Sequence, residues 1–212
     1  MTDTIEKRLG TLFWVAVGWL AVISLLAIFA PLLPIKDPDA YYLVKGVRPP
    51  YSPSGTHWFG TDQDARDMFA RTIYGARVSL VIGFVAIAFG MLVGGTAGII
   101  AGYLRGRTDK LISFIFIVFL SFPSLVLAIL ITALLDRGLV TIALTLGVLA
   151  VAPVGRLARA STLSFAEREF VTAARAIGAG DRRIIIRELL PNVVVPMGAL
   201  ALLGMAVAIV AE

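Results

Sequence analysis

The chain has 212 residues, of which 58% are hydrophobic and only 16% are charged. Soluble domains carry about 25% charged residues, so a mean hydropathy of +0.91 excludes an ordinary soluble fold and predicts an all-α polytopic membrane protein. The absence of cysteine excludes disulfides and thiolate metal sites, and the net charge of +5 is typical of basic cytoplasmic loops.

The first apolar run, residues 11–33, predicts a retained transmembrane helix after a short cytoplasmic N-terminus, residues 1–10. A signal peptide is the alternative, but its apolar core has about 7–15 residues and ends at a small-x-small cleavage site. This run is longer, and Pro31 and Pro34 close it without such a site.

Residues 34–76 predict an extracytoplasmic segment, because five prolines interrupt helix formation and several Tyr and Trp side chains favour the membrane interface. Its last part predicts an amphipathic helix that lies on the membrane surface at about residues 61–74. Thr61 and Asp64 have the spacing of a capping box, and Gly75 can end the helix.

The remaining residues, 77–212, predict a core of four further spans joined by short loops. The basic residues are concentrated in two segments, the loop at 104–110 and the segment at 156–191. With five spans in all, both segments and the N-terminus fall on one side, which is therefore predicted to be cytoplasmic. The four predicted spans occupy about 77–103, 111–135, 139–155 and 192–211.

Two features inside these spans predict how the helices pack. Gly90, Gly94, Gly98 and Gly102 recur every four residues, and such a stripe lets another helix approach closely. Pro123 removes a backbone donor in the middle of the third predicted span, so we expect a bend there.

The charged segment at 162–191 predicts a helix, a glycine turn and a second helix. Ser164 and Glu167 fit the capping box S-x-x-E, and Gly178 suits a left-handed C-cap. Asp181 is placed as the N-cap of the second helix. The predicted apolar side chains, and the proline expected to end the second helix, are Phe170, Ala173, Ala174, Ile177, Ile185, Ile186, Leu189 and Pro191.

Three uses of this hairpin follow from its residues. It could rest on lipid headgroups, bind DNA as a helix-turn-helix, or dock into a groove of a partner protein. The DNA interpretation is disfavoured, because both ends run into membrane spans and four acidic groups dilute the positive charge. The residues alone leave the first and third uses open.

The sequence lacks residues that several classes of membrane protein and enzyme need. The interiors of the second, third and fourth predicted spans contain no Asp, Glu, Lys, Arg or His, which disfavours a secondary carrier. The phosphate-binding pattern G-x-x-x-x-G-K-[ST] is absent. The single histidine, His57, is expected to be structural, so the chain is predicted to be neither an enzyme nor a direct binder of a cofactor or metal.

The sequence TAARAIGAGDRRIIIRELLPN resembles the cytoplasmic EAA loop of permease subunits from binding-protein-dependent ABC importers. The pattern of that loop is E-A-A, three residues, G, nine residues, I-x-L-P. Thr172 stands where Glu is usual, and Glu188 where Ile is usual. The matching residues are Ala173, Ala174, Gly178, Leu190 and Pro191.

The upstream sequence HWFGTDQDARDMFARTIYGARVSL resembles the dipeptide, oligopeptide and nickel branch of these permeases. That branch typically has GTD-x-x-GRD followed by YGAR-x-SL, and Ala65 replaces the usual Gly before Arg66 and Asp67. The resemblance covers about 57–212. Members usually continue beyond the equivalent of AIVAE, so the chain is expected to be truncated at its C-terminus.

The resemblance implies an ABC importer permease fold of the EAA-loop type in the bacterial inner membrane. It implies partners: a second permease, two cytoplasmic ATPases that carry ATP and Mg²⁺, an extracytoplasmic binding protein and the lipid bilayer, with no nucleic acid. Passive channel, secondary carrier and membrane-tethered DNA-binding regulator are the alternatives. The residues implied to dock the ATPase are Ser164, Glu167, Phe170, Thr172, Ala173, Ala174, Ile177, Gly178, Asp181, Ile185, Leu189, Leu190 and Pro191.

Overall fold

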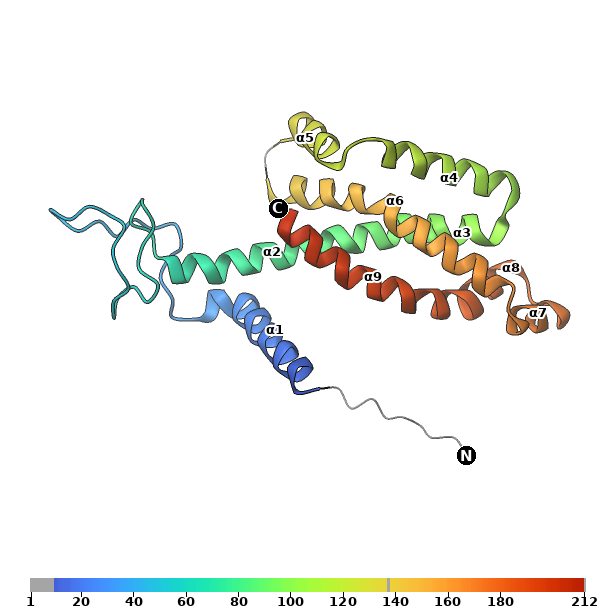
Figure 1. The fold of residues 1–212 in the computed structure, drawn as a ribbon, viewed down its shortest axis with the longest axis horizontal. Coiled ribbons are helices and arrows are strands. Elements are labelled where there is room, and N and C mark those ends of the chain that lie inside the picture. The colour runs from blue at the N-terminus through green and yellow to red at the C-terminus, as the bar shows by residue number, and fades with distance from the viewer. Residues whose placement is uncertain (1–9, 137, 212) are drawn as a thin grey trace. The chain divides into compact units, whose positions relative to one another are not determined.

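The computed structural model describes residues 10–136 and 138–211, so most of the predicted N-terminal segment 1–10 lies outside the described residues. Within the described ranges the regular elements are helices, and residues 33–67 form an irregular loop with one isolated bridge between Thr61 and Asp67. The predicted all-α class is confirmed. The helices are α1 (Thr11–Phe29), α2 (Met68–Gly90), α3 (Thr96–Leu104), α4 (Gly106–Ser121), α5 (Ser124–Leu134), α6 (Leu139–Ala166), α7 (Glu169–Ala176), α8 (Asp181–Arg183) and α9 (Leu190–Ala211) (Figure 1).

The chain divides into two compact units, Met1–Leu80 and Val81–Glu212. In the first unit, α1 is extended by a 3₁₀ turn at Ala30–Leu32. Only 6% of its most apolar stretch is buried, as expected for a helix whose side chains face lipid. A long loop then leads to the start of α2, and backbone hydrogen bonds such as Tyr42 N–H to Ala65 O (2.9 Å) hold it together.

The prediction of a separate surface helix at 61–74 is wrong, because residues 61–67 are not helical. The Asp62 carboxylate accepts backbone N–H bonds from Asp64 and Arg66 at 2.9 and 2.8 Å, which closes a turn in place of a helix. Asp67 caps the true helix, because its Oδ1 accepts the N–H of Ala70 at 2.8 Å. The helix begins at Met68 and passes through Gly75 without a break.

In the second unit, two π-helical turns make long continuous helices out of shorter ones. A π turn at Met91–Gly95 joins α2 to α3, and another at Ile184–Leu189 joins α8 to α9. Within residues 10–136 and 138–211, four helices are long and apolar enough to cross a membrane, and the pair α4–α5 adds a fifth if it counts as one span. The four are Thr11–Leu32, Met68–Leu104, Leu139–Ala166 and Asp181–Ala211.

The third predicted span, 111–135, is a pair of helices bent by 90° at Phe122 and Pro123. Neither α4 nor α5 alone covers a bilayer core, since their lengths are about 24 and 16 Å against about 30 Å. The pair nevertheless connects the two ends of α6. The C-terminal end of α3 lies beside that of α6, where Arg105 bonds Glu167 at 2.8 Å. Helix α4 therefore starts beside the C-terminal end of α6, whereas α5 leads to the N-terminal end of α6. Together α4 and α5 run back along the roughly 42 Å length of α6 (Figure 1).

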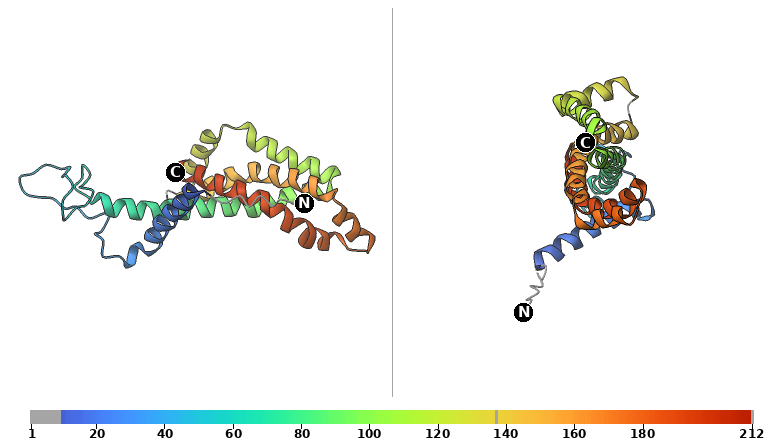
Figure 2. Two further views of the ribbon diagram at one scale, coloured as in Figure 1. Left: turned by 60° about the horizontal axis from the view of Figure 1, so that its bottom comes forward. Right: turned by 90° about the vertical axis from the view of Figure 1, so that its right-hand side faces the viewer.

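The glycine stripe lies directly against α6, and α3 and α6 run side by side in both views of Figure 2. A Cβ added at Gly90 would be 2.7 Å from Ala150 Cβ, and one added at Gly102 would be 2.8 Å from Arg159 O. Cβ atoms at Gly94 and Gly98 would overlap with carbonyl oxygens of α6. The helices approach so closely that a methyl group at any of the four positions requires them to separate.

Candidate functional site

The predicted hairpin begins later than its capping signal indicated. The helix expected to end at residue 155 continues to Ala166, so Ser164 is not an N-cap but an exposed residue in the last turn of α6. Glu167 is the C-cap of α6. Helix α6 continues because Thr162 and Ala166 are buried, at 0% and 5% exposure, and burial outweighs a local S-x-x-E signal.

The buried face of α7 agrees with the predicted one only in part, because Ala174 is buried and Phe170 partly buried. Val171 and Ala174 are buried, whereas Ala173 and Thr172 are exposed. Ile177 is 78% exposed. The apolar cluster formed here, with partly buried Phe170 and Ala179 at its edge, consists of Tyr103, Ala166, Val171, Ala174, Ile184 and Leu189. The i, i+3 spacing of Val171 and Ala174 could have predicted this buried pair. The prediction instead started the repeat one residue earlier, at Phe170.

A Schellman motif closes α7 at Gly178. The N–H of Ala179 donates to Ala174 O at 3.0 Å, and the N–H of Gly178 donates to Arg175 O at 2.9 Å. Gly178 has a φ of +82°, a left-handed conformation that costs other residues roughly 1–2 kcal/mol. A Cβ at this glycine would have no heavy atom within 4 Å, so the requirement for glycine is conformational and not steric.

The second helix of the hairpin starts and ends differently from the prediction. Gly180, not Asp181, is the N-cap, and the Asp181 carboxylate makes no capping bond. Pro191 does not end the helix, which continues to Ala211. The π turn at Ile184–Leu189, which ends two residues before Pro191, accommodates the missing backbone donor. Of the predicted apolar residues Leu189 is buried, Ile185 partly buried, and Ile186 and Leu190 exposed.

Polar contacts tie the short link between α3 and α4 to distant parts of the chain. Tyr103 Oη donates to Asp181 Oδ1 at 2.7 Å, and Arg105 pairs with Glu167. Arg159 donates to both carboxylate oxygens of Asp109, with the Nη2 to Oδ2 bond at 2.7 Å. Sequence reasoning missed these contacts, because each joins residues 50 or more positions apart and no local pattern marks them.

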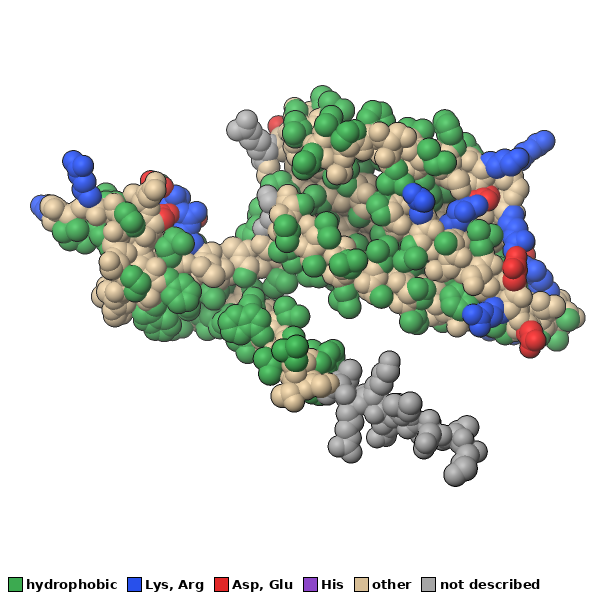
Figure 3. All heavy atoms as spheres, in the orientation of Figure 1, with side chains coloured by type: hydrophobic (Ala, Val, Ile, Leu, Met, Phe, Trp, Pro, Cys, Tyr) green, Lys and Arg blue, Asp and Glu red, His purple; other side chains and the backbone are tan. Residues whose placement is uncertain are grey.

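The outer surface of the hairpin combines apolar and basic side chains. A shallow hollow of about 660 Å³ is lined by backbone and side chains of the second helix: Gly180, Asp181, Arg182, Arg183, Ile186 and Arg187. Figure 3 shows Lys and Arg side chains gathered at this end of the second unit. Ile177, the C-cap of α7, adds a large exposed apolar side chain to the hairpin.

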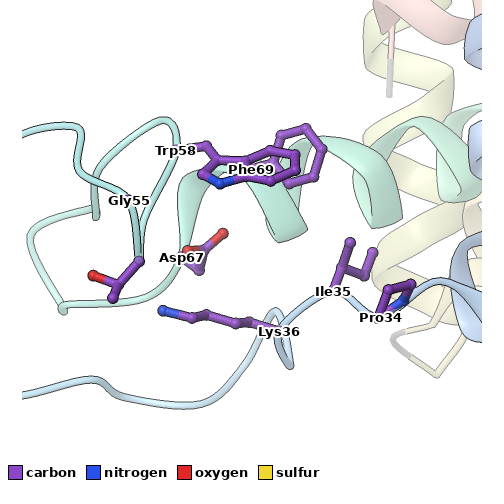
Figure 4. Close-up of a pocket in the computed structure, with 8 residues that line it drawn as sticks. Pro34, Ile35, Lys36, Gly55, Trp58, Asp67 and Phe69 are labelled. Carbon is purple, nitrogen blue, oxygen red and sulfur yellow. The ribbon is translucent and has the colours of Figure 1, made fainter.

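The first unit has a separate polar cluster around His57. His57 Nδ1 lies 2.7 Å from Asp67 Oδ2, and Lys36 Nζ lies 3.2 Å from the ring nitrogens. These contacts hold the His57 ring within the loop, and its structural role stays a prediction. Figure 4 shows Trp58 and Phe69 beside a cavity of about 290 Å³ whose wall includes Lys36 and Asp67. Across the described part of the chain, no group of three or more His, Cys, Asp or Glu is placed to hold a metal ion.

The same loop holds a carboxylate with a shifted pKa. Burial of Asp62 acts to raise its pKa, but the backbone donors of Arg66 and Asp64 and the Arg66 guanidinium outweigh it. The pKa of Asp62 is therefore lowered from its ordinary value of 3.8.

Comparison with known proteins identifies the family of this chain. The family described as "Binding-protein-dependent transport system inner membrane component" matches residues 94–212, which include the glycine-packed helices, the bent pair and the hairpin. The chain belongs to this family. The resemblance seen in the sequence is thereby confirmed, and the protein is a multi-pass membrane protein.

Individual relatives agree with the family. The dipeptide transport system permease protein DppC of Alkalihalophilus pseudofirmus is 42% identical over 195 residues, covering 91% of this chain and 63% of the relative. The oligopeptide transport system permease protein OppC of Bacillus subtilis is 35% identical, covering 82% and 56%. The glutathione transport system permease protein GsiD of Pectobacterium atrosepticum is 35% identical, covering 66% and 46%. The chain thus spans roughly half to two thirds of the length of these relatives.

Proposed function

We propose that this chain is a permease subunit of an ATP-driven importer and forms part of its translocation pathway for dipeptides or oligopeptides. Family membership and the names of the relatives support this proposal. Those names refer to peptides, which favours a peptide over nickel as cargo. The subunit itself is non-catalytic, and ATP and Mg²⁺ bind to a separate ATPase chain. A second permease and an extracytoplasmic binding protein complete the importer.

The hairpin that follows α6 docks this ATPase. The observation that carries the proposal is Ile177, a large apolar side chain that is 78% exposed at the turn of a rigid hairpin. Leaving such a side chain in water is unfavourable by roughly 1.5–3 kcal/mol relative to burying it. The Schellman turn at Gly178 fixes how α7 joins the second helix of the hairpin, so an ATPase that moves α7 also moves the second helix.

This arrangement sets the orientation in the membrane. The ATPase is cytoplasmic, so the hairpin and the basic link between α3 and α4 face the cytoplasm, and the loop before α2 faces outward. Basic residues are typical of the cytoplasmic side. The N-terminus is then cytoplasmic as well, because α1 and the long helix Met68–Leu104 each cross once.

Purification of the importer from its host, followed by peptide uptake into vesicles, tests the proposal. Ile177→Asp is expected to lose most of the co-purifying ATPase, and Ile177→Leu, which keeps an apolar side chain, retains it. Gly178→Val is expected to insert normally but to transport poorly, since a β-branched residue disfavours a φ of +82°. Equal ATPase recovery from Ile177→Asp and wild type, or normal uptake by Gly178→Val, would contradict the docking role.

A further inference from the structure

One side chain joins the hairpin to the membrane-spanning bundle through a directional contact. Tyr103, in the last turn of α3, is 8% exposed, and its ring belongs to the apolar cluster under α7. Its hydroxyl group reaches the edge of that cluster and donates to Asp181 Oδ1 at 2.7 Å. The guanidinium group of Arg175 lies over the same ring, 5.5 Å from its centroid.

Tyr103 therefore contacts both arms of the hairpin. Arg175 is in the last turn of α7, and Asp181 is the first residue of the second helix. The Schellman turn at Gly178 lies between them. A single aromatic side chain thus holds the two arms against α3, with its apolar ring under one arm and its hydroxyl group bonded to the other.

The other end of this connection is rigid. Gly102, the residue before Tyr103, packs so closely on α6 that an added Cβ would lie 2.8 Å from both Arg159 O and Thr162 Cβ. Gly98, one turn earlier, is packed more closely still. Helix α3 cannot shift toward α6 at this point, so a displacement of the hairpin that pushes Tyr103 toward α6 moves α3 and α6 together.

The apolar contacts under α7 cannot fix this geometry alone. Hydrophobic contact is non-directional, so Val171 and Ala174 would permit α7 to rotate or slide by a small amount at little cost. A hydrogen bond loses strength steeply when its angle or distance changes, and a bond to a carboxylate is stronger than one between neutral groups. The bond from Tyr103 to Asp181 selects one position of the hairpin relative to α3.

We propose that Tyr103 is a positioning residue which, through its hydrogen bond to Asp181, transmits movement of the hairpin to α3 and α6. The inference rests on the proposed function, because the movement is supplied by the ATPase that docks on the hairpin. Without the bond the hairpin still holds the ATPase, but part of its displacement is lost at the contact with α3. Hydrolysis then continues while fewer peptides cross per ATP.

The test uses the complete importer, purified with its partner subunits and reconstituted in lipid vesicles. Tyr103→Phe removes the hydroxyl group and keeps the ring, and Asp181 is left in contact with water because it is exposed. The expected result is a fall of about tenfold in peptide taken up per ATP hydrolysed, with unchanged ATPase recovery. Tyr74→Phe, near the start of the helix Met68–Leu104, is the matched control and is expected to keep the wild-type ratio.

A double-mutant cycle separates the direct bond from independent effects of the two residues. Asp181→Ala is expected to lower the ratio as much as Tyr103→Phe, and the double variant no further. A wild-type ratio in Tyr103→Phe would overturn the inference, and so would additive losses in the double variant. Loss of ATPase from Tyr103→Phe would also overturn it, since the role would then be assembly. Failure of the wild-type complex to import any peptide would instead overturn the proposed function.

Discussion

Substitution of Gly98 by alanine tests the close packing of α3 against α6. A Cβ at this position would lie 2.8 Å from Ala158 Cβ and 2.9 Å from Arg159 N, and it would overlap with Gly155 O. Carbon atoms reach their optimal contact at about 3.5–4.0 Å, so the helices must separate by roughly 1 Å. A radial gap of about 0.5–1 Å loses a quarter to a half of the dispersion attraction between the facing atoms.

The expected cost of Gly98→Ala follows from this separation. Overpacking of a well-packed core costs about 1–3 kcal/mol, and the upper end applies here because backbone atoms of α6 cannot move aside as a side chain does. For a chain of this size, about 3 kcal/mol corresponds to a melting temperature lower by roughly 6–12 °C. The intrinsic preference of helices for alanine over glycine, up to about 1 kcal/mol, acts in the opposite direction.

Thermal stability in detergent measures this effect. Aliquots of the tagged protein are heated, and the remaining monodisperse peak is followed by fluorescence-detected size-exclusion chromatography. Gly198→Ala in α9 is the matched control, because an added Cβ there has no heavy atom within 4 Å. We expect the control to melt at or slightly above the wild-type temperature. A Gly98→Ala variant that melts within a degree of wild type would refute the argument that the stripe fixes the distance between these helices.

Three further predictions concern carboxylates. Asp67→Ala removes the cap of α2 and the hydrogen-bond partner of His57, so it should destabilise the protein by about 1–3 kcal/mol. Thermal unfolding followed by tryptophan fluorescence measures this effect. Asp64→Ala, at an exposed residue, should cost less, and equal effects of the two variants would contradict the capping role of Asp67. Asp109→Asn should lower stability by about 1–3 kcal/mol because it breaks a partly buried, bidentate pair, whereas Glu167→Gln, in an exposed pair, should stay within about 1 kcal/mol. Because the pKa of Asp62 is lowered in the folded protein, its stabilising contribution is complete above pH 3.8 and is lost as the pH falls below that value; Asp62→Asn should remove this part of the acid sensitivity, and an unchanged acid transition would exclude it.

Local patterns in the sequence determined the class of the protein, the close-packing stripe and the turn. Long apolar runs require lipid whatever their neighbours are, and glycines at four-residue spacing lie on one helix face in any fold. Gly178 adopts the left-handed conformation that its position after α7 predicted. These properties depend on the residue and its near neighbours, so they could be read without the fold.

Helix ends and long-range contacts were decided by the tertiary structure. The signals at Thr61, Ser164 and Pro191 were genuine local preferences, but α2 starts later, α6 ends later and the last helix does not stop. A cap or a proline contributes about 1–3 kcal/mol, and burial of several side chains or a π turn beside the proline can outweigh it. The bond between Tyr103 and Asp181 joins residues 78 positions apart, and only the packing of α3 on α6 brings them together.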